Sequence, residues 1–298
     1  MILVVGSTGK LGSEICQRLT ALGKSVRGFV RSSSDADKVA ILKEMGVETI
    51  LGDLRDPSSL AAACQGVDTV ITTATSISSM QPGDSIPVTD QQGQLDLVLA
   101  AQRASVQKFI YISFAQKMEP CPMTTAKRAV ERSILSSGMD YTILCPGPYM
   151  EVWLNPGLGF DYPNAKATIY GDGHAKNTYI SRNDVAEYVA KSLENPAASN
   201  ALFEVGDSKM YSLLEIVRIF EEVGGESFDL QFIPAIALES QRDAATDPRQ
   251  ISRAALMHNV AIGIHMNTSR AEKAFPDIQL KSVKEFSQDI LVALPRGA

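Results

Sequence analysis

Short apolar runs alternate with longer amphipathic segments over the first half of the chain. The runs are rich in Val and Ile and apolar throughout, which is typical of parallel strands covered on both faces by helices. They predict strands at residues 2–5, 25–30, 48–50, 69–73, 109–113 and 141–144. The amphipathic segments predict helices at residues 11–22, 36–45, 57–64, 91–104 and 124–137.

The regular alternation of strand and helix predicts the α/β class, with a doubly wound parallel sheet of the Rossmann type. Each gap between strands is long enough for a crossover helix, which parallel neighbours require. Residues 1–150 are therefore expected to form this domain.

The pattern becomes less regular after Pro146, where glycines and prolines crowd one loop. It still predicts strands at 168–170 and 202–205, helices at 183–194 and 212–223, and a poorly delimited helical stretch at 234–266. Residues 151–298 are expected to form a smaller lobe, interleaved with the first domain, which covers the strand ends and shapes a substrate pocket.

Composition narrows the class of partner. The net charge is −6, whereas a surface that binds duplex nucleic acid is expected to be basic, so no nucleic-acid partner is expected. No apolar stretch reaches the roughly 18 residues of a membrane helix and no signal peptide precedes the first strand, so no membrane partner is expected. The cysteines are scattered without a CxxC pair and the histidines lie far apart, which favours a reducing cytoplasm and no metal site.

A glycine-rich loop directly follows the first predicted strand and opens the first predicted helix. Its spacing is GxxGxxG, with Gly6 for the tight turn, Gly9 for close approach of the backbone to a pyrophosphate, and Gly12 for close packing of helix on strand. The free N–H groups at the helix start would face the phosphates. The loop therefore predicts a dinucleotide site formed by Gly6, Ser7, Thr8, Gly9, Lys10, Leu11 and Gly12.

The end of the second strand indicates which dinucleotide binds. NAD sites usually have an acidic residue about 20 residues after the loop, but this chain has Arg31, followed by Ser32. A carboxylate repels a 2′-phosphate and a guanidinium binds it, so NADP(H) is the expected cofactor.

Two further strand ends are candidates for the same site. Asp53 and Leu54 follow the third strand, and Asp53 can either accept a hydrogen bond from adenine or cap the next helix. The small residues Thr73, Ala74 and Thr75 end the fourth strand, which suits close passage of a dinucleotide and equally suits plain packing.

Several segments together carry a family resemblance. They are residues 6–12, 30–31, 52–54, 109–113, 137–142, 145–147 and 183–186, with Lys127 and Glu131 between them. In combination they resemble the atypical short-chain dehydrogenase/reductase superfamily, in its NmrA-like branch, which includes isoflavone-reductase-like proteins. The resemblance covers most of the chain and is strongest before residue 150.

The resemblance implies catalytic roles for Lys127 and Ser113. The wider superfamily uses Tyr-x-x-x-Lys on one helix, with the lysine on the nicotinamide ribose, but here Met123 occupies the tyrosine position. In isoflavone-reductase-like relatives a lysine serves without that tyrosine, and Lys127 matches it. From the residues alone, Lys127 can equally be a helix-surface lysine paired with Glu131.

The resemblance also assigns the segment after the sixth strand. Pro146, Gly147 and Pro148 are expected to lie beside the nicotinamide of the bound cofactor. Met123, Tyr149 and Trp153 are candidate substrate contacts, although Tyr149 and Trp153 can equally be core residues or anchor the loop. Tyr111 and Tyr149 are the nearest tyrosines in sequence that can replace the missing one.

Two functions remain open from the sequence. The first is an NADPH-dependent reductase, active as a monomer or homodimer, that transfers hydride to a small apolar or aromatic carbonyl, quinone or enone. The alternative is a non-catalytic NADP(H)-binding redox sensor or an assembly or regulatory protein, which the loss of the tyrosine also fits.

Overall fold

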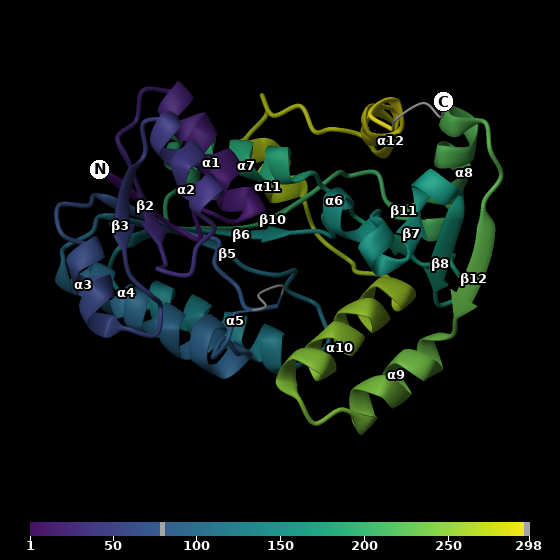
Figure 1. The fold of residues 1–298 in the computed structure, drawn as a ribbon, viewed down its shortest axis with the longest axis horizontal. Helices are drawn as coiled ribbons and strands as arrows, with labels where there is room; N and C mark the ends of the chain where they lie inside the picture. Colours follow the sequence, from purple (N-terminus) through teal and green to yellow (C-terminus); the bar gives the residue numbers. More distant parts are fainter. Residues whose placement is uncertain (78–80, 295–298) are drawn as a thin grey trace.

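A parallel sheet of seven strands forms the centre of the computed structural model, which describes residues 1–77 and 81–294. The strands are β1 (Ile2–Val5), β2 (Val26–Val30), β3 (Glu48–Leu51), β4 (Thr69–Thr72), β5 (Lys108–Ile112), β6 (Asp140–Pro146) and β10 (Ala201–Val205). Their spatial order is β10-β6-β5-β4-β1-β2-β3. The predicted fold class, a doubly wound α/β sheet, is confirmed (Figure 1).

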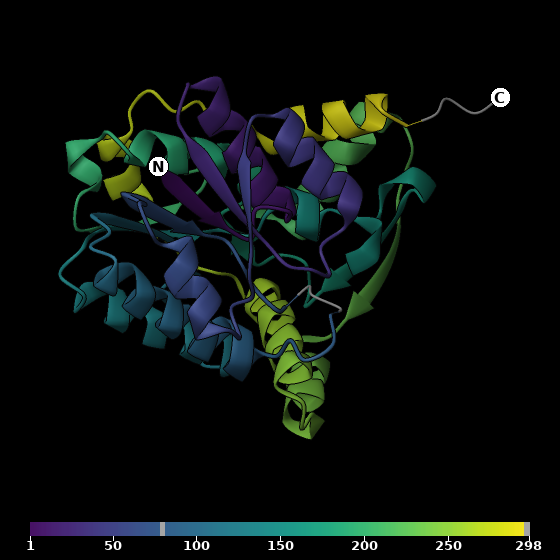
Figure 2. The same ribbon diagram turned by 60° about the vertical axis from the view of Figure 1, so that its left-hand side comes forward.

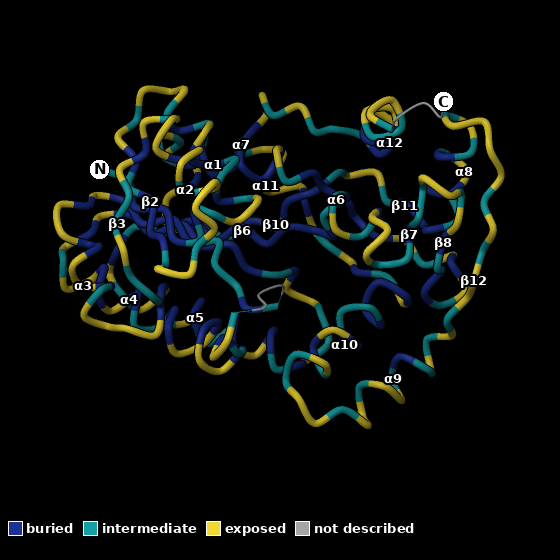
Figure 3. The backbone as a smooth tube through the Cα atoms, viewed as in Figure 1, coloured by how far each residue is buried: buried dark blue, intermediate teal, exposed yellow. Residues whose placement is uncertain are grey.

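Helices cover both faces of the sheet (Figures 1 and 2). One face carries α1 (Lys10–Ala21), α2 (Ala36–Glu44), α7 (Arg182–Ser192) and α11 (Ser269–Ala274). The other face carries α3 (Pro57–Ala63), α4 (Gln94–Arg103) and α5 (Pro122–Leu135). The central strands β1, β4 and β5 are therefore buried throughout, which explains why they read as continuous apolar runs, whereas the edge strand β3 is exposed or half-buried (Figure 3).

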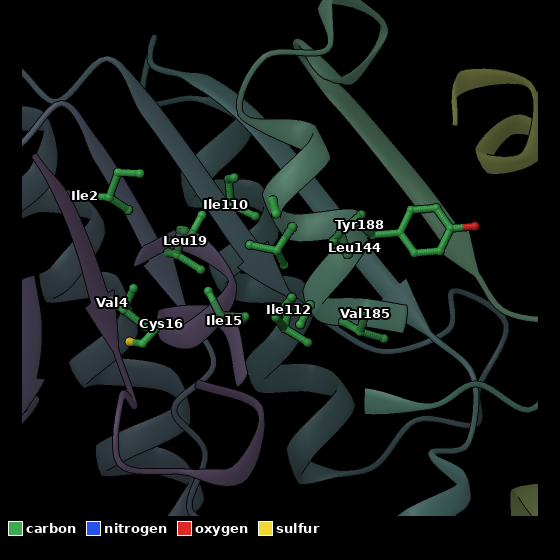
Figure 4. Close-up of a cluster of buried hydrophobic side chains, with 14 of the residues drawn as sticks. Ile2, Val4, Ile15, Cys16, Leu19, Ile110, Ile112, Leu144, Val185 and Tyr188 are labelled. Carbon is green, nitrogen blue, oxygen red and sulfur yellow. The ribbon is translucent and has the colours of Figure 1, made fainter. Parts of the chain in front are cut away.

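Successive strand residues point to opposite helical layers. Ile110 and Ile112 of β5 pack toward Ile15 of α1 and Val185 of α7, as Figure 4 shows. The intervening Tyr111 faces α5 instead. Because side chains alternate between the two faces of the sheet, only every second residue of β5 can contact the side chains of α5.

The second half of the chain shares this sheet with the first half. Its strand β10 pairs in parallel with β6, with Ala201 opposite Thr142, and α7 packs beside α1. The helix and strand predicted at 183–194 and 202–205 are these elements.

The helix predicted at 91–104 begins earlier than its apolar pattern indicates. A π-helix, η1 (Ile86–Gly93), leads directly into α4. The hydroxyl of Ser85 accepts a hydrogen bond from the Val88 N–H at 3.3 Å, and Pro87 fits the first turn, where an N–H has no helical partner. The cap at Ser85 sets the start of this helical segment, so the prediction from apolar periodicity began five residues too late.

The rest of the second half forms a smaller layer beyond the carboxyl ends of the strands. It contains a three-stranded sheet of β7 (Phe160–Asp161), β8 (Lys166–Tyr170) and β12 (Asp229–Ile233), and a two-stranded one of β9 (Lys176–Asn177) and β11 (Tyr211–Ser212). Its longer helices are α8 (Leu213–Gly224), α9 (Ala235–Ala244), α10 (Pro248–Ile262) and α12 (Val283–Val292), with the short α6 (Met150–Trp153). The stretch predicted as one helical region at 234–266 is divided at Asp247-Pro248, where Asp247 caps α10.

Helix α10 is fastened at both ends. At its start the Ser252 hydroxyl accepts the N–H of Met123 on α5 at 3.1 Å. At its end the side chain of Asn177, which is fully buried, donates to the Val260 carbonyl at 3.0 Å and accepts the Ile264 N–H at 2.9 Å. These bonds hold α10 across the first turn of α5.

We expect Asn177→Ala to lower the free energy of unfolding by about 3 kcal/mol, because it leaves one buried carbonyl and one buried N–H without partners. Urea titration at pH 7 measures the change. The exposed Asn164 bonds only Asp161, so Asn164→Ala is the control and should change stability little. Equal losses from the two variants would contradict the role assigned to Asn177.

Candidate functional site

The glycine loop lies at the point where the strand order reverses, between β1 and β4. Gly6 has a φ of +88°, and a Cβ placed on it would lie 2.7 Å from the Thr73 hydroxyl oxygen and 2.9 Å from the Ala74 amide nitrogen. The loops after β1 and β4 therefore touch, and they form one wall of the crevice where doubly wound sheets bind ligands.

The start of α1 packs directly against this loop because Gly12 has no side chain. A Cβ at Gly12 would lie 2.1 Å from the Gly6 carbonyl oxygen, whereas one at Gly9 meets only that oxygen, at 3.1 Å. Gly9 is the N-cap of α1 and makes no side-chain cap bond, so a phosphate can accept hydrogen bonds from the first N–H groups of the helix.

The other loop residues differ in what they offer a ligand. Ser7 is fully buried and its hydroxyl donates to the Phe29 carbonyl at 3.0 Å, so its side chain serves the fold. Lys10 is exposed, and Leu11 packs on the core beneath α1. The Thr75 hydroxyl accepts the Ile77 N–H at 3.3 Å.

Arg31 lies at the carboxyl end of β2 beside a groove of about 350 Å³. The groove is also lined by Ser32, Ser34 and Lys43. The Arg31 side chain is 30% exposed, and its guanidinium forms an ion pair with the buried carboxylate of Asp84. Arg31 and Ser32, the predicted phosphate contacts, therefore line one groove.

Asp53 follows β3 and is engaged by Arg55, which donates to both of its carboxylate oxygens. This contact lowers the pKa of Asp53. Leu54 is buried and packs against Gly93 at the end of η1. The cap of the following helix is Asp56 and not Asp53.

Lys127 is a buried cation at the carboxyl end of β5. It is 5% exposed, its Nζ donates to the Ile112 carbonyl at 3.0 Å, and the same atom lies 4.8 Å from the centroid of the Tyr111 ring. Burial lowers the pKa of this ammonium, and the nearby carboxylates of Asp90 and Glu131 oppose the shift. Lys127 is therefore not a surface lysine paired with Glu131, since Glu131 bonds Arg128 and Ser113.

Asp90 was missed by the sequence analysis. It is fully buried on η1, and the N–H and hydroxyl of Ser76 bond one carboxylate oxygen. The other oxygen, Oδ1, has no hydrogen-bonding partner among residues 1–77 and 81–294. The phenol oxygen of Tyr111 is also buried without a partner. Among the described residues no ion pair within 4.0 Å joins Asp90 to Lys127, but the charge of Asp90 favours the Lys127 ammonium.

Ser113 lies in a second buried polar cluster. Its hydroxyl donates to the Glu131 carboxylate and accepts from Arg128 at 3.3 Å. Gln116 bonds the same Glu131 and also Cys145 Sγ at 3.2 Å, and burial raises the pKa of the Cys145 thiol to about 12. Ser113 is thus oriented by charged neighbours, and Cys145 is not a reactive thiolate.

The segment after β6 packs tightly against β9 and its continuation. A Cβ at Gly147 would lie 2.0 Å from the Thr178 carbonyl oxygen, and the Pro148 carbonyl accepts the Ile180 N–H at 3.2 Å. Pro146 ends β6 opposite Val205. This close approach keeps Pro146, Gly147 and Pro148 at the carboxyl edge of the sheet.

The three predicted substrate contacts lie in three different apolar clusters. Met123 is fully buried between α5 and α10, with Ala126 and Ala255. Trp153 packs edge-on against Tyr170 in the smaller layer, with ring centroids 6.4 Å apart. Tyr149 packs on the core beneath α1, and its phenol oxygen is buried without a hydrogen-bonding partner.

Within residues 1–77 and 81–294, no three His, Cys, Asp or Glu side chains are grouped so as to hold a metal ion. No helix in this part of the chain has both the length and the apolar character to cross a membrane.

Comparison with known proteins places these features in a family. The model of the NmrA-like family matches residues 1–276. The isoflavone reductase homolog IRL of Zea mays is 28% identical over 312 residues, covering 96% of each chain. The photosystem II assembly factor Ycf39 of Synechocystis is 27% identical over 245 residues, covering 81% of this chain and 73% of that protein.

Solved structures share the fold. The triphenylmethane reductase of Citrobacter, crystallised with NADP(H), superposes with a TM-score of 0.78 at 23% identity, covering 98% of this chain and 100% of that one. At this identity the superposition shows a common fold.

We expect Gly12→Ala to destabilise the chain by more than about 2 kcal/mol, because the added Cβ forces α1 away from the Gly6 carbonyl. Gly9→Ala is the matched control in the same loop, with room for a small adjustment. Thermal unfolding of both variants makes the comparison. A Gly12→Ala protein as stable as Gly9→Ala would contradict the packing described.

We expect Asp90→Asn to lower the pKa of Lys127 further, because a buried ammonium loses the strongest charge that favours it. Between its folded and unfolded pKa values, Lys127 binds fewer protons in the folded chain, so stability rises with pH there. The range of rising stability should therefore begin at lower pH in Asp90→Asn than in the wild type.

Urea titrations from about pH 6 to pH 10 measure this difference, above the range where ordinary carboxylates titrate. Lys127→Met is the control background, in which Asp90→Asn should no longer change the pH profile. An identical shift in that background would mean that Asp90 does not act on Lys127.

Proposed function

The chain belongs to the NmrA-like family, and we propose that within it the protein is an NADPH-dependent reductase of a small organic substrate. The observation that carries the proposal is the buried Lys127 ammonium, held by the Ile112 carbonyl at the carboxyl edge of the sheet. Burying a cation there costs folding free energy unless a ligand or a counter-charge interacts with it. Reductases among the relatives, such as the isoflavone reductase homolog, support this reading.

We propose NADP(H) as the cofactor, bound along the crevice between β1 and β4. The residues fit a dinucleotide, because Gly6 and Gly12 keep the backbone clear and the first turn of α1 has no side-chain cap. Arg31, Ser32, Ser34 and Lys43 provide a basic, hydroxyl-lined groove for a 2′-phosphate. The NADP(H) complex of triphenylmethane reductase, a protein of the same fold, supports the assignment.

The residues around Lys127 have separable roles in this proposal. NADPH supplies a hydride when bound. Lys127 donates hydrogen bonds to the hydroxyls of the nicotinamide ribose, and Asp90 keeps its charge balanced. Ser113, held by Glu131 and Arg128, orients the same end of the crevice. Pro146, Gly147 and Pro148 line the path of the nicotinamide.

We propose a small, apolar or aromatic substrate that enters between the sheet edge and the smaller layer. Met123, Tyr149 and Trp153 are the candidate contacts, and Met123 cannot supply a proton because a thioether has none to give. The proton then comes from water or from a pocket side chain. The phenol of Tyr111 lies under Lys127, and burial raises its pKa, which makes it a poor donor at neutral pH.

The relatives also favour a second candidate function. The similarity to the photosystem II assembly factor Ycf39 supports a non-catalytic protein that binds NADP(H) and acts on a protein partner. A methionine at position 123, where the wider superfamily has a catalytic tyrosine, is as compatible with a non-catalytic protein as with a reductase. Consumption of the nucleotide separates the two.

We expect purified protein to oxidise NADPH with at least one member of a panel of quinones, enones and triphenylmethane dyes. Lys127→Met should lower that rate by about 100-fold or more, while the NADPH dissociation constant changes by less than about tenfold. Loss of absorbance at 340 nm measures the rate.

The control variant is Lys117→Met, which alters an exposed lysine of the loop before α5. Tight NADPH binding without oxidation by any member of the panel would contradict the reductase and favour the assembly or sensor function.

A further inference from the structure

Residues 81–85 cross the carboxyl ends of β2 and β3 and are attached there at two points. At one point Asp84 pairs with Arg31, which follows β2. At the other, Arg55, which follows β3, donates to the Pro82 carbonyl at 2.9 Å. Gly83 has a φ of +81°, and a Cβ on it would lie 2.4 Å from Arg55 Nη1, so the segment lies directly on that guanidinium.

The Arg31–Asp84 pair is well buried on the carboxylate side. Arg31 Nη1 donates to the two carboxylate oxygens at 3.0 and 2.8 Å. The Asp84 side chain is 2% exposed, and the Thr89 hydroxyl donates to it at 3.3 Å. A carboxylate therefore already bonds one nitrogen, Nη1, of the guanidinium that the sequence assigns to a 2′-phosphate.

A carboxylate and a phosphate compete for the same guanidinium group of an arginine. Each presents two oxygens to the guanidinium fork, and each is stabilised by the same positive charge. Two anions on one guanidinium repel each other, and the repulsion is strong where one of them is buried. A 2′-phosphate at Arg31 must therefore either displace Asp84 or bind against its charge.

The adenine side of the same region is engaged in the same way. Arg55 donates to both oxygens of Asp53 while its Nη1 holds Pro82. Arg55 thus ties the candidate adenine contact to the segment that carries Asp84. The position of residues 81–85 is thereby linked to that of Asp53.

We propose that Asp84 is an internal competitor for the 2′-phosphate at Arg31 and thereby sets how strongly the chain prefers NADP(H) to NAD(H). This inference rests on the proposed NADP(H) site. NADH has no 2′-phosphate, so it binds with the Arg31–Asp84 pair intact. NADPH loses part of its added binding energy in replacing Asp84, which keeps the preference lower than Arg31 alone would give.

The test measures dissociation constants for NADPH, NADH and adenosine 2′,5′-bisphosphate on the full chain, wild type and Asp84→Asn. Asparagine keeps the size of the side chain and its acceptor for Thr89 but removes the charge. NADPH and the bisphosphate should bind about tenfold more tightly to the variant, which corresponds to about 1.4 kcal/mol, and NADH should change by less than about twofold. The fluorescence of the reduced nicotinamide measures the binding of NADPH and NADH, and competition with NADPH measures the binding of the bisphosphate.

A double-mutant cycle with Arg31→Met provides the control. In that background Asp84→Asn should no longer affect NADPH binding, because the phosphate has lost its partner. Asp84→Ser, which also removes the charge, is measured in parallel, and unfolding of each variant without nucleotide checks that the fold is retained.

Three results would overturn the inference while leaving the proposed function intact. Weaker NADPH binding by Asp84→Asn would show that Asp84 positions Arg31 for the phosphate. Equal tightening for NADH and NADPH would show that the substitution only loosens residues 81–85. Unchanged NADPH binding would show that Asp84 does not compete. If the wild type and Asp84→Asn bound neither dinucleotide, the proposed cofactor and this inference would both be wrong.

Discussion

The contact between Gly12 and the Gly6 carbonyl is the constraint on which the rest of the site depends. Since no side chain fits between them, α1 starts directly above the end of β1, and its uncapped N–H groups point into the crevice beside β4. The loop after β4 then touches Gly6 and leads into η1, which carries Asp90. One backbone approach therefore fixes the proposed phosphate end of the crevice and, through the loop after β4, the position of the counter-charge for Lys127.

The buried charges beneath the sheet edge form a second level of organisation. Lys127, Asp90, Glu131 and Arg128 all lie on the α5 side of β5, and Tyr111 and Ser113 reach them because alternate residues of that strand face the same way. In this low-dielectric layer each charge depends on the others for its energy. A substitution at Asp90 or Glu131 is therefore expected to change the pKa of Lys127 as well as its own contacts.

The sequence predicts what local patterns encode, and it misses what long-range pairing decides. The central strands and the glycine loop were readable because burial on both faces and a turn at φ +88° leave signatures in consecutive residues. Asp90 and Asp84 left no such signature: an acid before a helix usually caps it, and only the fold brings these two to Lys127 and Arg31. Strand β12 was also missed: Leu230 and Phe232 alternate with polar residues, but the run is only five residues long and largely exposed.

Strand β10 also affects how the chain can be made and divided. Its partner β6 ends at Pro146, but β10 begins only at Ala201, so a growing or shortened chain that ends near residue 150 presents the whole of β6 as an unpaired edge. Exposed apolar edges recruit other strands, and pairings distant in sequence form slowly. The second half of this protein thus completes the hydrogen bonding of the first, and residues 1–150 expressed by themselves would be prone to aggregate through that edge.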